Sequence, residues 1–141
     1  MKYEEIRTQA TEDLKTDIFD LAHESVRTAN IFTKYLDMLR GEKVLLKKLE
    51  DEYNKLYKDS YLWYHGEADD EVYEKNPWPK KVNRMDLPMY LNADENIIKM
   101  TDRVVLQKEK VAYLERVVKF IENRNYGIKN AIDYLKFTQG N

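Results

Sequence analysis

The chain has 141 residues, a length that suits one ordinary domain, and its charges are so nearly balanced that the net charge is −2. This balance excludes an overall field that would draw the protein to nucleic acid or to a membrane, so any polyanion site must be local. The absence of cysteine excludes disulfides, thiolate nucleophiles and Cys-based zinc sites. No apolar signal segment opens the chain and no run of about eighteen apolar residues occurs, which predicts a soluble protein without a membrane span.

A low content of chain breakers, four glycines and three prolines, favours long helices over a sheet with many turns. Residues 1–18 can form a first amphipathic helix, with Ile6, Leu14 and Ile18 on one side. We therefore predict a mainly α fold that begins with a short helix.

A much longer helix is predicted over residues 22–64. Its apolar and small residues recur every three or four positions, and they are Ala22, Ser25, Ala29, Phe32, Leu36, Leu39, Leu46, Leu49, Tyr53, Leu56 and Ser60. Gly41 lies inside this run and costs about 1 kcal/mol relative to alanine. Because the spacing keeps its phase across Gly41, we expect one continuous or slightly bent helix.

The length of this helix bears on the shape of the molecule. It would span about 64 Å, whereas a compact domain of this size has a diameter of roughly 37 Å. Residues 1–141 are therefore predicted to form a single elongated helical domain. Such a monomer leaves apolar surface unburied, and association with copies of itself or with another chain is the usual remedy.

Cations and aromatic rings crowd the end of the long helix. Lys55 and Lys58 lie beside its apolar stripe, Tyr57, Tyr61, Trp63 and Tyr64 follow, and Gly66 ends it. A cation that meets a phosphate, next to a ring that stacks on a base, is how proteins hold single-stranded nucleic acid. The alternative is that the tyrosines pack in a core while the lysines are only solvated.

A connecting arm is predicted over residues 67–91, where the helical periodicity disappears. The stretch "EADDEVYE" carries five acids and no bases, and "KNPWPKKVNR" then adds Lys75, Lys80, Lys81 and Arg84 beside Trp78. Pro77, Pro79 and Pro88 argue against a regular helix and hold the arm extended. Its basic half is a second candidate for binding DNA, and a solvated loop is the alternative.

The residues "NADE", 92–95, have the form of a capping box, so a second long helix should begin at Asn92. Its apolar spacing continues to about residue 123, which lets it lie antiparallel to the first helix. The stripe contains Ile97, Thr101, Val104, Lys108, Val111, Leu114, Val118 and Ile121.

The stretch "NRNYG", 123–127, is expected to break the second helix and to lead into a short C-terminal helix with Ile128, Ala131, Ile132 and Leu135 on its apolar face. We predict that Tyr126, Ile128, Ile132 and Leu135 contact another subunit, because so short an apolar face is unstable alone. The alternative is that this helix packs back onto its own chain.

The sequence offers little for catalysis. It contains no Gly-rich phosphate loop, nucleophile elbow or His-Glu-x-x-His spacing, and His23 and His65 have no second ligand nearby. The acids Asp69, Asp70 and Glu71 lack the alternating spacing of a calcium loop. We therefore predict a protein that is not an enzyme, with no catalytic residue, no metal site and no cofactor.

Three segments, "WYHGEADDEVYEKNPW", "YLNADENIIKM" and "NRNYGIKNAIDYLKFTQG", resemble in this order and spacing the UvsY family of recombination mediators of T-even-type phages. The resemblance is closest to family members from phages of cyanobacteria. It covers nearly the whole chain and is most specific at Arg124 to Ile132. It maps the family's basic-aromatic segment onto Lys58, Tyr64 and Gly66, with Ser60 where some members carry a second basic residue.

The resemblance implies a non-catalytic protein that binds single-stranded DNA and forms a closed homo-oligomeric ring, with a heptamer expected. It implies that the protein loads the phage recombinase onto DNA covered by the phage single-strand-binding protein, in the cytoplasm of the infected bacterial host and away from membranes. Around such a ring the predicted cations, Lys55, Lys58, Lys75, Lys80, Lys81 and Arg84, and the rings of Tyr61 and Tyr64 would form a continuous track. The alternative function is a coiled-coil adaptor that does not bind nucleic acid.

Overall fold

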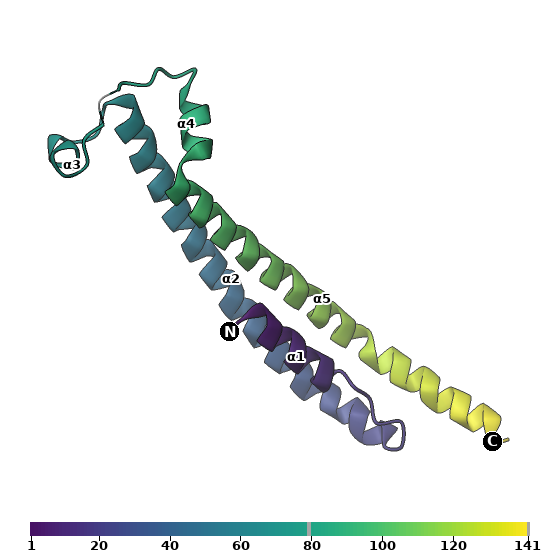
Figure 1. The fold of residues 1–141 in the computed structure, drawn as a ribbon. Helices are drawn as coiled ribbons and strands as arrows, with labels where there is room; N and C mark the ends of the chain where they lie inside the picture. The colour runs from purple at the N-terminus through teal and green to yellow at the C-terminus, as the bar shows by residue number, and fades with distance from the viewer. Residues whose placement is uncertain (79, 141) are drawn as a thin grey trace. The chain divides into compact units, whose positions relative to one another are not determined.

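The computed structural model describes residues 1–78 and 80–140, and Pro79, which the sequence placed in the arm, lies outside them. The regular secondary structure of the described residues is helical, in the order α1 (Tyr3–Asp13), α2 (Leu21–His65), α3 (Asp70–Lys75), α4 (Leu87–Ala93) and α5 (Glu95–Thr138) (Figure 1). The mainly α prediction and the continuous long helix through Gly41 are confirmed. Within these residues, none of the helices is both long and apolar enough to span a membrane.

The chain divides into two compact units. The terminal unit joins Met1–Lys43 to Glu109–Asn141, and the middle unit is Val44–Lys108. Both α2 and α5 contribute one part to each unit. The predicted single elongated domain stays a prediction.

In the terminal unit, α1 lies along the first part of α2, and the last part of α5 packs antiparallel to α2 (Figure 1). Ile6, Tyr35, Leu114 and Ile121 are almost completely buried in its core. The hydroxyl of Tyr35 donates a hydrogen bond of 2.7 Å to the carboxylate of Asp13 at the end of α1. This bond gives the buried hydroxyl of Tyr35 a hydrogen-bond partner and ties α2 to the end of α1.

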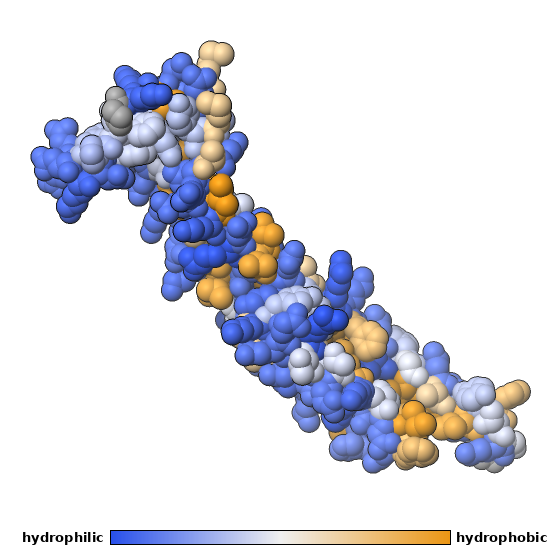
Figure 2. Space-filling view, viewed as in Figure 1, coloured by the Kyte–Doolittle hydropathy of each residue, from blue (hydrophilic) through white to orange (hydrophobic). Residues whose placement is uncertain are grey.

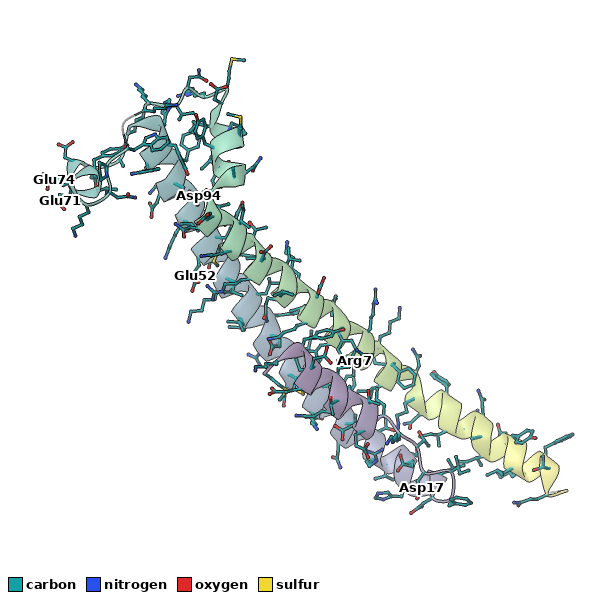
Figure 3. The ribbon with its side chains drawn as sticks, in the orientation of Figure 1. Arg7, Asp17, Glu52, Glu71, Glu74 and Asp94 are labelled. Carbon is teal, nitrogen blue, oxygen red and sulfur yellow. The ribbon has the colours of Figure 1, made fainter. Side chains whose placement is uncertain are left out.

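Helix α1 is shorter than the predicted 1–18. It ends at Asp13 because the chain then turns, and the carboxylate of Asp17 accepts a hydrogen bond of 2.9 Å from the backbone N–H of Phe19. Figure 3 shows Asp17 on the loop between α1 and α2. Ile18 is consequently exposed, and its predicted place on the apolar side of a helix is wrong.

The first part of α2 buries a different face from the predicted one. Ala22, Ala29 and Leu36 are exposed, and the buried positions there are Leu21, Glu24, Thr28, Ile31 and Tyr35. The apolar pattern missed this face because several of its members are polar and find partners inside the unit. From Leu39 onward the buried or half-buried positions agree with the prediction.

In the middle unit, the second part of α2 packs antiparallel to the first part of α5, with α3 and α4 beside the end of α2 (Figure 1). Its core cluster consists of Tyr64, Val82, Leu87, Leu91 and Ile97. The extended arm predicted over 67–91 is wrong where α3 and the start of α4 form. Pro88, taken as a helix breaker, stands in the first turn of α4, where a proline needs no hydrogen-bond partner.

The predicted start of the second long helix is also displaced. Asn92 lies within α4, and α5 begins at Glu95 with Asp94 as its cap. The carboxylate of Asp94 accepts hydrogen bonds from the backbone N–H groups of Asn96 and Ile97, at 2.9 and 3.0 Å. Asp94 therefore does what the sequence assigned to Asn92.

Helix α5 does not break at residues 123–127, and the separate C-terminal helix is wrong. The buried residues Ile121, Arg124 and Ile128 continue one face through this stretch. Gly127 faces open space, so its only cost is the conformational freedom of glycine. Further toward its start, α5 buries Met100 and Gln107, whereas the predicted stripe members Thr101 and Lys108 are exposed.

Candidate nucleic-acid interface

The predicted DNA-binding cations all belong to the middle unit. Lys55 and Lys58 lie on α2, Lys75 is the last residue of α3, and the remaining three precede α4; these three are Lys80, Lys81 and Arg84. All are exposed, and none forms an ion pair with another described residue. Their charges are thus available for an external phosphate.

The fold brings Lys81 onto the end of α2. Gly66 ends the helix with a φ of 80°, and a Cβ added there would lie 3.4 Å from Cγ of Lys81. The next residue, Val82, donates its backbone N–H to the carbonyl of Tyr64 at 3.0 Å, and Nδ1 of His65 lies 2.8 Å from the carbonyl of Val82. These bonds fix the basic segment against the helix that carries Lys55 and Lys58.

Lys58 lies in less favourable surroundings. It lines a hollow together with Asp59, Glu67 and Asp69, whose carboxylates would repel a phosphate. Lys58 is therefore a weaker candidate for binding DNA than Lys80, Lys81 and Arg84.

Five of the six acids of the arm lie on α3 or in the residues just before it, and Asp86 alone lies next to α4. Figure 3 shows Glu71 and Glu74 on α3, and Figure 1 shows α3 and α4 on different sides of the end of α2. A polyanion is consequently favoured on the side of Arg84 and disfavoured on the side of α3. The described residues contain no group of acidic or histidine side chains placed to hold a metal ion.

The aromatic residues are mostly packed against one another. Trp78 lies 4.8 Å from Trp63 and 5.3 Å from Tyr64 between ring centroids, and indole Nε1 of Trp63 donates to the carbonyl of Asn76 at 2.9 Å. Tyr64 is only 9% exposed. Its hydroxyl donates a hydrogen bond of 2.6 Å to Asp94, and burial together with this bond raises the pKa of Tyr64 to about 12.

The base stacking predicted for Tyr64 does not fit its position, because its ring is enclosed by the core. Tyr61 is half-buried against the same cluster and keeps part of its surface open. The burial of Tyr64 agrees with the alternative in which the tyrosines are packing residues.

Tyr73 was missed by sequence reasoning and completes the end of α2. Its hydroxyl donates to the carbonyl of Trp63 at 2.8 Å, close to the carbonyl of Leu62, and accepts from the N–H of Ala68. The only sequence signal was a single ring within the acidic stretch. Asp94 and Val82, which position Tyr64 and the basic segment, were missed as well.

The residues predicted to contact another subunit separate into two groups. Ile128 is 4% exposed and lines a groove with Leu21 of its own unit, whereas Tyr126 and Leu135 are exposed and Ile132 is half-buried. Tyr134 and Phe137 are exposed nearby, and Figure 2 shows apolar residues along the C-terminal part of α5. Ile128 thus packs back onto its own chain, and the others remain available to a partner.

Comparison with known protein families shows to which family this chain belongs. Residues 9–141 match the family model described as "Recombination, repair and ssDNA binding protein UvsY". The chain belongs to the UvsY family. This family consists of non-enzymatic mediators that bind single-stranded DNA in recombination and repair, so the predicted family, function class and lack of enzymatic activity are confirmed.

Solved structures agree in fold. Three crystal structures of the recombination mediator protein UvsY of bacteriophage T4, in lattice types IV, II and I, superpose with TM-scores of 0.86, 0.87 and 0.84. Their identities to this chain are 18%, 17% and 16%; they cover 97%, 99% and 95% of it, and the match includes 99%, 98% and 98% of their own lengths. No curated protein matches the chain. A special closeness to members from phages of cyanobacteria stays a prediction.

Proposed function

We propose that this member of the UvsY family binds single-stranded DNA through the exposed cations of its middle unit, mainly Lys80, Lys81 and Arg84. It would use this contact to load the phage recombinase onto DNA coated by the phage single-strand-binding protein. The place of action is the cytoplasm of the infected bacterial host. Family membership supports the single-stranded DNA binding, whereas these residues, partners and location are our proposal.

The observation that carries the proposal is that these three exposed cations, which form no ion pair with another described residue, lie within five residues of one another in a segment held against the end of α2 by the bond from Val82 to Tyr64. Lysines such as Lys34 and Lys47 are instead engaged by Asp13 and Asp51, each at 2.6 Å. A cation without a carboxylate partner can neutralise a phosphate, and so release the counterions condensed on the DNA, without first breaking an ion pair. Many such contacts together bind a polymer tightly, yet each single contact dissociates easily. This combination suits a protein that must transfer DNA to a recombinase.

We propose further that the protein forms a closed homo-oligomeric ring, with a heptamer as the expected form. The exposed apolar side chains at the end of α5 support this, because Tyr126 and Phe137 are 69% and 81% exposed and leave apolar surface in water. A ring repeats a modest basic patch at every subunit, so weak contacts add along one strand.

The experiment combines native mass spectrometry with fluorescence anisotropy on labelled oligo-dT and on duplex DNA at two salt concentrations. We expect about six to eight subunits, tighter binding to oligo-dT than to duplex, and a steep loss of binding with salt. A dimer that binds no DNA would instead support the coiled-coil adaptor. Equal binding to duplex would contradict recognition of unpaired bases.

A further inference from the structure

Two methionines stand out of the surface next to the basic segment. Met85 is 91% exposed and Met89 is 64% exposed, and they lie directly after Lys80, Lys81 and Arg84. Figure 2 shows a pale orange projection at α4 among blue residues, and Figure 3 shows sulfur-tipped side chains directed away from it. We propose that Met85 and Met89 contact the bases of single-stranded DNA whose phosphates meet these cations.

The exposure of the two methionines is not the result of a loosely attached segment. Leu87 and Leu91, on the opposite side of α4, are each only 1% exposed. The backbone before α4 is held as well, because Asn83 accepts hydrogen bonds from the N–H of Asp86 at its side chain, at 3.1 Å, and from the N–H of Leu87 at its carbonyl, at 3.2 Å. Helix α4 therefore presents Met89, and the hydrogen-bonded turn before it presents Met85, outward from a fixed backbone.

Charge decides which partner fits this surface. Lys80, Lys81 and Arg84 are accompanied by a single acid, Asp86, between residues 80 and 90. The surface is thus cationic with apolar side chains at its edge, which complements a strand that carries phosphates on one side and unpaired bases on the other. In duplex DNA the bases are stacked on one another, so their faces are not free to contact the methionines.

The rings nearest the basic segment are mostly packed, which leaves base contact there to other side chains. Tyr64 is enclosed by the core, and Trp63 and Trp78 are half-buried against each other, so their faces are largely occupied. Methionine is flexible and polarizable, makes favourable contacts with aromatic rings, and belongs to the apolar residues that insert between bases. Met85 and Met89 are the apolar side chains that the structure exposes in this basic segment.

This inference rests on the proposed function and predicts a distinct signature. Replacing both methionines, Met85→Ala with Met89→Ala, should weaken binding to labelled oligo-dT about fivefold to tenfold, at the lower end of the loss caused by removing an aromatic ring that stacks on a base. The slope of log affinity against log salt should stay the same, because no cation is removed. On an abasic deoxyribose-phosphate oligomer, the variant and the unchanged protein should bind alike.

Two controls make the test sharp. Val105→Ala with Leu106→Ala removes exposed apolar surface elsewhere in the middle unit and should leave binding to oligo-dT unchanged. Met85→Leu with Met89→Leu keeps apolar bulk and should retain most of the affinity. Circular dichroism melting of each variant checks that the fold is kept.

The outcomes separate the two claims. If the unchanged protein binds oligo-dT and the double alanine variant binds it equally well, the methionines serve a protein partner or none, and the inference is wrong while the proposed function stands. The inference also fails if the variant loses as much affinity for the abasic oligomer as for oligo-dT. If the unchanged protein does not bind oligo-dT, the proposed function itself is wrong.

Discussion

Arg124 of α5 forms an ion pair with Glu24, a hundred positions earlier in the chain, and donates a hydrogen bond to its carboxylate; both side chains are almost fully buried. The same guanidinium donates to the backbone carbonyl of Glu24 and to the hydroxyl of Thr28, both at 2.7 Å. Arg27 also binds the carboxylate of Glu24, and it donates to the carbonyls of Asp13 and Lys15. One carboxylate thus connects α2, α5 and the loop after α1.

The first prediction concerns this ion pair. Arg124→Leu should lower the free energy of unfolding by about 3 kcal/mol, because removal of one partner leaves part of the buried charge of Glu24 unneutralised. Urea denaturation followed by circular dichroism measures the change. Arg116→Leu, on an exposed face of the same helix, should change stability by less than about 0.5 kcal/mol. A loss no larger than that of the control would mean that the pair is dispensable.

The second prediction is a dependence of stability on pH. The hydrogen bond from Arg27 lowers the pKa of Glu24 below its ordinary value of 4.5, burial opposes this, and the bond from Arg124 adds to the lowering. Because the folded pKa lies below the unfolded one, the stabilisation is complete above about pH 5 and is lost as the pH falls through the folded pKa.

Urea titrations of the unchanged protein and of Glu24→Gln at pH 7 and pH 4 test this dependence. The difference in unfolding free energy between the two proteins should shrink at pH 4, because below the ordinary pKa of 4.5 the carboxylate takes up protons more readily in the unfolded chain than in the folded one. Glu122→Gln, at an exposed position of α5, serves as the control and should match the unchanged protein at both pH values. A difference that is the same at both pH values would argue against the charged network.

The third prediction contrasts two glycines. Gly66→Ala should destabilise the fold by about 1–2 kcal/mol, because its φ of 80° is costly for any residue with a Cβ and Lys81 is already in contact. Gly41→Ala should stabilise it by up to about 1 kcal/mol, since the glycine lies inside α2 with open space around it. Thermal melting of both variants provides the measurement. If Gly66→Ala stabilised the fold, residue 66 would not adopt the positive φ described for the turn after α2.

The fourth prediction separates packing from DNA contact at Tyr64. Tyr64→Phe removes the hydroxyl that donates to Asp94 and should cost about 1 kcal/mol of stability while affinity for oligo-dT stays unchanged. Anisotropy and urea denaturation of the same preparation give both quantities. If affinity fell while stability held, Tyr64 would act on DNA after all.

The sequence predicts the long helices well and their ends poorly. Helix α2 was predicted because its apolar spacing persists through Gly41, and this signal survives one poor helix former. The buried face near Glu24 was missed because a pattern of apolar residues cannot show that a carboxylate will be neutralised by Arg124, which is a hundred positions away. Pairing over such a distance is decided by the tertiary fold.

In the arm, the sequence alone does not decide which residue begins the next helix. Asn92 and Asp94 are both good helix caps, and only the packing of Leu91 and Ile97 into the core selects Asp94. The sequence favours a loop at Pro88 because proline breaks helices in their interior, yet a proline is favourable in the first turn of a helix. The candidate cations were predictable from composition, whereas the burial of Tyr64 was not, because only the fold encloses its ring.

The most direct test of DNA binding by the middle unit compares two triple variants with the same loss of charge. One replaces Lys80, Lys81 and Arg84 by alanine, and the other replaces Arg116, Lys119 and Lys129, exposed cations of the terminal unit that form no ion pair with a described residue. We expect the first to reduce the slope of log affinity for oligo-dT against log salt by about 2, as the loss of three phosphate contacts requires. The second should leave the slope unchanged. Equal losses in both variants would contradict the account, because DNA would then respond to net charge and not to this site.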